Sequence, residues 1–143
     1  MKLLVRLLLL LLLPLAAQAE PAVRVYDLNG NLVSQSDFNG NVNLTPHHIP
    51  SANRMALEGV PKGDGIAINM EQPFPGAGGR HRATFTYGTQ ADIAMTPRNA
   101  LAAGVWDARR IYRADGLYTP QIRSNLQELI QMNKTQYPLT FAK

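Results

Sequence analysis

The sequence predicts an α+β domain in which a strand-and-loop front half is backed by two helices near the C-terminus. Three observations indicate this class. An Asn-Gly turn separates two alternating apolar runs, a short apolar strand stands among Gly- and Pro-rich stretches, and two Thr-Pro pairs each precede an apolar stripe of helical period. With 143 residues, the chain is long enough for one domain of ordinary size.

Residues 1–19 read as a secretory signal peptide. Lys2 and Arg6 form a basic start, Leu7–Leu13 is an apolar run, and Ala17-Gln18-Ala19 is a small-x-small cleavage site. The apolar run is shorter than the roughly 20 residues that a transmembrane helix needs. We therefore expect export, cleavage after this site, and a secreted or periplasmic protein.

Residues 20–43 are expected to form an N-terminal β-hairpin that leads into the main domain. Asn29-Gly30 separates two alternating runs within Val23–Ser36, which is the strongest short-range signal for a hairpin. Further along, Ile66–Met70 reads as a short strand that is entered from a turn at Gly63-Asp64-Gly65. Because no helix begins after that turn, it is not expected to bind a phosphate.

Two helices are expected in the last third of the chain. Thr96 and Pro97 supply the N-cap and first turn of one helix, which ends at Gly116, and Thr119-Pro120 starts the other in the same way. The side chains expected in the core share helical spacing and are Leu101, Val105, Trp106, Ala108, Ile111, Tyr112, Ile122, Leu126, Leu129 and Ile130.

Charge is distributed unevenly along the chain. Glu20–Gly79 holds three basic and six acidic residues, whereas Arg80–Lys143 holds nine basic and four acidic residues, and seven of those nine are arginine. Arginine suits phosphate because its guanidinium group makes bidentate contacts; a solvated basic helix face is the alternative. The absence of cysteine excludes disulfides and thiolate chemistry, and no Gly-x-Ser-x-Gly elbow supports a serine nucleophile.

The histidines are the residues that most strongly suggest chemistry. Only three are present, and His47 and His48 are adjacent. Neighbouring side chains on an extended segment point to opposite faces, so one imidazole can hold a metal ion while the other reaches a substrate. The alternative is that the pair is a coincidence of composition and that the third, His81, is a structural residue.

The residues around the histidines follow a recognisable order. Pro46–Ser51 reads Pro-His-His-Ile-Pro-Ser, Gly63–Met70 reads Gly-Asp-Gly-Ile-Ala-Ile-Asn-Met, and His81–Thr84 and Tyr87-Gly88 follow. This order resembles the HNH/endonuclease VII-like nuclease domains of bacterial polymorphic toxins, which are also called His-Me finger or ββα-metal domains. The resemblance covers residues 44–143 and implies a small ββα-metal core.

The resemblance implies roles for the matched residues. His47 and His81 would bind one divalent metal ion, and His48 would be the general base. The asparagine that orients the base or supports the loop would be Asn69 or Asn53, so the implied catalytic set is His48, Asn69 and Arg82. Arg82 would face a phosphate. The basic second half adds further candidates for contact with the nucleic-acid backbone, so that the set is Arg82, Arg109, Arg110, Arg113 and Arg123.

Several details of this assignment depart from the pattern or stay open. Arg80 stands where such toxins often have an acidic residue, and Phe85 stands where a further histidine would lie one helical turn past the second ligand. The third metal ligand would be water or an acid such as Asp64. Thr84 is expected to cap or pack the start of the metal-site helix rather than to take part in chemistry.

These residue types suit phosphodiester hydrolysis. A neutral histidine activates water, and a divalent cation neutralises the charge that builds on the phosphate. The candidate cations are Mg, Mn, Ni and Zn. We therefore expect a secreted metal-dependent endonuclease, an antibacterial toxin that cuts DNA rather than RNA with little sequence preference and has an acidic immunity protein as partner. The alternative is a non-catalytic secreted binding module whose histidines hold a structural metal or pack.

Overall fold

The computed structural model describes residues 23–26, 32–35, 44–72 and 79–142, so the predicted signal peptide lies outside the described residues. Its strands form a four-stranded sheet in the order β2-β1-β4-β3, and all neighbours are antiparallel. The strands are β1 (Val23–Tyr26), β2 (Leu32–Gln35), β3 (Leu44–His48) and β4 (Ala67–Glu71). The helices are α2 (Ala52–Ala56), α3 (Pro97–Ala114), α4 (Pro120–Gln136) and α5 (Pro138–Phe141), with single 3-10 turns η2 (Lys62–Asp64) and η3 (His81–Ala83). The predicted α+β class is confirmed.

The predicted N-terminal hairpin is part of the main sheet. β1 pairs with β2, with Val25 opposite Ser34, while the Asn29-Gly30 turn lies outside the described residues. β1 also pairs with β4, which in turn pairs with β3. The hairpin therefore extends the same sheet that carries His47 and His48.

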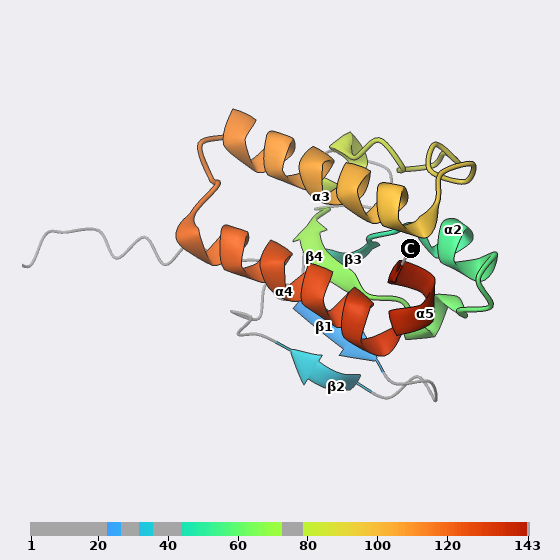
Figure 1. Ribbon diagram of the computed structural model, residues 1–143. Coiled ribbons are helices and arrows are strands. Elements are labelled where there is room, and N and C mark those ends of the chain that lie inside the picture. The colour runs from blue at the N-terminus through green and yellow to red at the C-terminus, as the bar shows by residue number, and fades with distance from the viewer. Residues whose placement is uncertain (1–22, 27–31, 36–43, 73–78, 143) are drawn as a thin grey trace, which may run out of the picture.

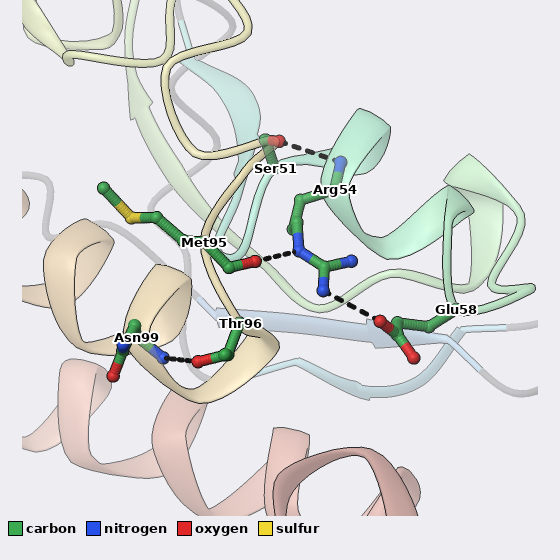
Figure 2. A network of polar contacts seen from close by, with 6 residues as sticks. All are labelled: Ser51, Arg54, Glu58, Met95, Thr96 and Asn99. Atoms are coloured by element: carbon green, nitrogen blue, oxygen red, sulfur yellow. Dashed lines mark hydrogen bonds and ion pairs between the residues drawn. The ribbon is translucent and has the colours of Figure 1, made fainter.

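Both predicted helices begin at their predicted caps, and the first one ends at its predicted glycine. The Thr96 hydroxyl accepts a hydrogen bond from the Asn99 amide at 3.2 Å (Figure 2), and the Thr119 hydroxyl accepts one from the Ile122 amide at 3.2 Å. Gly116 follows the end of α3 with a φ of +69°, a conformation that favours glycine.

The core lies between the helices and the sheet. Figure 1 shows α3 and α4 side by side, joined by a short connection, and α4 packs against β1 and β4. The buried apolar side chains of this core include Ile49, Met55, Ile66, Ile68, Met70, Leu101, Ala108, Tyr112, Ile122, Leu126, Leu129 and Phe141. Among the described residues, no helix is long and apolar enough to cross a bilayer.

The prediction that Trp106 lies in the core is wrong. Its side chain is 64% exposed, whereas Tyr112 is 1% exposed as expected. At 100° per residue, position 106 lies about 140° around the helix from Leu101, which faces the core. The apolar neighbours of Trp106 in the sequence suggested burial, but the helix turns its indole to the outside.

The short helix α2, which the sequence analysis did not predict, is inserted between β3 and β4. The Ser51 hydroxyl caps it by accepting a hydrogen bond from the Arg54 amide at 3.1 Å, and it donates one to Asp92 at 2.6 Å. Arg54 donates from Nε to the Met95 carbonyl at 2.6 Å and pairs with Glu58 at 2.8 Å (Figure 2). These contacts tie α2 to the segment that leads into α3.

Candidate metal and catalytic site

The three histidines line one open cleft of about 570 Å³. His47 and His48 come from the end of β3, and His81 comes from η3, 33 positions after His48 in the chain. The other walls are formed by the start of α2 and by the segment after η3. The described residues that complete the lining are Thr45, Pro46, Ser51, Ala52, Asn53, Lys62, Thr86, Tyr87, Gly88, Thr89 and Gln90.

His47 and His81 are spaced as two ligands of one metal ion would be. Their ring centres are 5.2 Å apart, with an angle of 66° between the ring planes. Two imidazoles bound to a tetrahedral cation through nitrogens at about 2 Å have ring centres about 5 Å apart. The separation of the two rings is therefore that of two imidazole ligands on one divalent cation.

The electrostatics of the pair also fit a metal site. Burial, together with the nearby His81 and His48, lowers the pKa of His47 to about 3. Burial also lowers the pKa of His81. Both rings are therefore neutral near pH 7, which is the form that coordinates metal. Asp64, considered as a third ligand, is buried in η2 and does not line the cleft; within the described ranges, no three His, Cys, Asp or Glu side chains are grouped as a metal site.

Gln72 and Tyr87 support His81. The Gln72 side-chain carbonyl accepts a hydrogen bond from Nδ1 of His81 at 2.5 Å, which leaves the Nε2 lone pair of that ring for a ligand. The Tyr87 ring meets the His81 ring edge-on, with centres 5.1 Å apart. The sequence analysis noted Tyr87 only as part of a motif and missed Gln72, because no pattern in the sequence relates the end of β4 to a residue nine positions later.

His48 is oriented by the backbone of η2. Its Nε2 donates a hydrogen bond to the Lys62 carbonyl at 2.9 Å, so in the neutral ring Nδ1 carries the free lone pair. Burial is the main cause that lowers the pKa of His48, although its hydrogen bond to Lys62 acts in the opposite direction. A Cβ at Gly65 would lie 2.8 Å from Cδ2 of His48, so glycine at this position leaves room for the ring.

The other residues assigned by resemblance have different positions. Asn53 lines the cleft from α2, whereas Asn69 is 1% exposed within β4 and does not line it. Arg82 is exposed, next to His81, and is outside the lining. Thr84 was expected at the start of a helix, but it lies at the end of η3, where its hydroxyl donates to the His81 carbonyl at 2.7 Å and closes the turn.

Arg80 anchors the segment that carries His81. Its guanidinium pairs with Glu71 of β4 at 3.1 Å and with Asp115 after α3 at 2.9 Å, and it lies 5.5 Å from the centre of the Tyr112 ring. Arg80, which departs from the expected acidic residue, thus has a structural role here. Where a metal-site helix was expected after His81, the structure has only the single turn η3, and α3 begins at Pro97.

The predicted nucleic-acid-binding arginines do not form one group. Arg109, Arg110 and Arg113 line a second hollow of about 370 Å³ on α3. Arg123 is exposed on α4 and lies outside the described lining of that hollow. Two regions of the molecule therefore carry features of a binding site, the histidine cleft and this basic face of α3.

Comparison of the chain with protein-family models, with curated proteins and with solved structures gave no significant match. The geometry of the two regions is therefore the basis for inferring function.

Proposed function

We propose that the protein is a secreted, metal-dependent nuclease that hydrolyses phosphodiester bonds through a ββα-metal type of site. The observation that carries this proposal is the convergence of His47, His48 and His81 on one cleft with different partners for each ring. Two of the rings contact each other at the spacing of joint metal ligands. The third is held apart from them by a backbone carbonyl.

His48 is suited to act as general base in this site. The Lys62 carbonyl accepts the proton of Nε2, so Nδ1 can accept a proton from a water molecule in the cleft. Gly65 leaves room for the ring in this orientation. The lowered pKa keeps the ring neutral near pH 7, so its free nitrogen can accept a proton.

His47 and His81 would hold the cation, with Gln72 fixing the His81 tautomer. A bound divalent cation would neutralise the charge that develops on the phosphate and on the leaving oxygen. Asn53 takes the place of Asn69 as the asparagine that can reach the reacting groups, since it lines the cleft. Arg82, exposed beside His81, remains a candidate for contact with a neighbouring phosphate.

The proposed substrate is DNA, cut with little sequence preference, because no groove-reading module such as a helix-turn-helix is present in the described fold. A secreted nuclease of this type would act as a toxin. The producing cell would then need an acidic immunity protein to cover the basic surface.

The decisive experiment is incubation of the purified protein with plasmid DNA and with RNA in Mg, Mn, Ni or Zn, with EDTA as control. We expect cleavage of DNA that requires the metal and stops with EDTA. No metal-dependent cleavage of either nucleic acid would refute the nuclease proposal.

The histidine variants separate a nuclease from a binding module. His48→Ala should retain metal binding, measured by calorimetry, and lose activity by roughly 10²–10⁴-fold. His47→Ala and His81→Ala should lose both metal binding and activity. If His48→Ala cleaves at the parental rate, the base is elsewhere, and if His81→Ala binds metal normally, the ββα-metal assignment is wrong.

A further inference from the structure

The basic face of α3 carries the only tryptophan of the chain, and this tryptophan is turned outward. Trp106 is 64% exposed, although its neighbours Asp107 and Ala108 are buried. Together with Arg109, Arg110, Arg113 and Ala114, it lines the hollow of about 370 Å³ described above. An exposed indole within a concave, basic surface is typical of a binding site rather than of a solvated helix face.

Two of the arginines of this hollow have the contacts and the free donors that an anionic ligand requires. The Arg109 guanidinium lies 5.4 Å from the ring centres of both Trp106 and Tyr118, and its buried Nε has no hydrogen-bond partner among the described residues. Arg113 makes no ion pair with any residue in the described ranges. Arg110 differs, because it pairs with Asp107 at 2.8 Å. Two guanidinium groups, those of Arg109 and Arg113, therefore lie beside an exposed aromatic ring without an acidic partner among the residues that the structure describes.

We propose that Trp106, Arg109 and Arg113 form a secondary binding site for single-stranded nucleic acid. An unpaired base stacks on the Trp106 indole, and backbone phosphates contact the two arginines. From Trp106 to Arg113 the helix rises about 10 Å, enough for roughly three stacked nucleotides. In a duplex the base faces are already stacked, so this site selects unpaired strands. The proposal deepens the nuclease function above and rests on it for the identity of the polyanion.

Because the chain has one tryptophan, its fluorescence reports on this site alone. We would titrate His48→Ala, with EDTA present to prevent cleavage, with oligothymidylate, with a duplex of the same length and with polyglutamate. Oligothymidylate should quench the fluorescence at lower concentration than the duplex does, and polyglutamate should not quench it. Equal quenching by polyglutamate would overturn the proposal in favour of an acidic protein partner. If no ligand quenches the fluorescence, the proposal is refuted and the contact between Trp106 and Arg109 is only a contact between two surface side chains.

Variants test the two kinds of contact separately. Trp106→Ala should raise the Kd for labelled oligothymidylate roughly tenfold, whereas Leu139→Ala, which removes another exposed apolar side chain, should leave it unchanged. Arg113→Gln should lower the slope of log K against log salt by about 0.7, and Arg98→Gln, on the same helix but outside the hollow, should not. An unchanged Kd in Trp106→Ala would overturn the proposal.

The two proposals can fail independently. Metal-dependent cleavage of DNA without quenching of Trp106 would leave the nuclease function intact and remove the secondary site. Quenching by oligothymidylate without any cleavage would support the secondary site at Trp106 and refute the nuclease function.

Discussion

His47 and His48 are adjacent in the chain but have different surroundings. His47 is 5% exposed and contacts the ring of His81, whereas His48 is half-buried and donates to a backbone carbonyl. The first arrangement favours a neutral ligand, and the second fixes which nitrogen is free to accept a proton. Two predictions follow from single residues in these surroundings.

Gly65→Ala should displace His48 without straining the backbone. Gly65 has a φ of −77°, which alanine adopts readily, but a Cβ there would lie 2.8 Å from the His48 ring. We expect cleavage to fall by up to about 100-fold, because a small misplacement of a catalytic group has effects of that size. The metal-induced rise in Tm should be retained.

Gly63→Ala is the matched control, since a Cβ at Gly63 meets nothing within 4 Å. It should cleave at the parental rate. If Gly65→Ala is as active as Gly63→Ala, the orientation of His48 does not matter for the reaction.

The stability of the metal-free protein should fall as the pH is lowered through the titration of His47. The pKa of His47 is about 3 in the folded protein and about 6.5 in the unfolded chain, so below pH 6.5 only the unfolded chain takes up the proton. This contribution is fully present above pH 6.5 and is lost as the pH falls toward 3. Between about pH 7.5 and 5 the loss should be about 2 kcal/mol.

Urea denaturation in EDTA at a series of pH values measures this loss. His47→Gln lacks the titrating group and should show a shallower dependence, with the remainder due to the lowered pKa values of His48 and His81. Identical pH profiles for the two proteins would contradict the assignment of the effect to His47.

At the scale of elements, the site depends on two short segments held by polar contacts. α2 is tied to the segment before α3 through Ser51, Asp92 and Arg54, and η3 is tied to β4 and to the end of α3 through Arg80. Neither segment has the length to be stable by itself, since isolated helices shorter than about 12 residues are marginal in water. The polar contacts that α2 and η3 make with the longer elements therefore fix the positions of the cleft walls.

Arg80→Gln should loosen η3 and thereby misplace His81. The Arg80 side chain is mostly buried between Glu71 and Asp115, so we expect a loss of about 1–3 kcal/mol of stability together with a smaller metal-induced rise in Tm. Arg82→Gln, two positions later and exposed, should change stability by less than about 0.5 kcal/mol. If Arg80→Gln loses stability but binds metal with unchanged affinity, Arg80 supports the fold and does not position His81.

At the scale of the whole molecule, the antiparallel sheet and the α3–α4 pair hold together segments that are far apart in the chain. β3 and η3 meet across the cleft because β4 pairs with β3 and then leads toward η3. A cation shared by His47 and His81 would link these two segments. Metal binding should therefore be coupled to the stability of the entire domain.

Saturating metal should raise the Tm of the protein. A ligand that binds only the folded state adds about 2.7 kcal/mol at a concentration of 100 times its Kd. Thermal unfolding with and without Ni or Zn measures the effect, and His48→Ala should respond as the parental protein does. His47→Ala and His81→Ala should show no rise. A rise of parental size in either variant would contradict a shared site.

Local chemistry controls several parts of this protein, and these parts could be predicted from the sequence. The Thr96 and Thr119 caps and the Gly116 helix end depend on hydrogen bonds and dihedral preferences within a few residues, and all three are present. The predicted pairing of β1 with β2 is also present, whereas its Asn29-Gly30 turn lies outside the described residues. The three histidines also stood out in the sequence as candidates for one site.

The contacts between distant side chains could not be predicted from the sequence, because they depend on the tertiary structure. It placed Asn53 in the cleft and Asn69 in the sheet interior, brought Gln72 and Tyr87 to His81, gave Arg80 its anchoring role, and turned Trp106 outward. These outcomes depend on strand pairing and helix rotation, which act between residues distant in the chain. A single sequence carries the local preferences of each segment but not the register in which the segments pack.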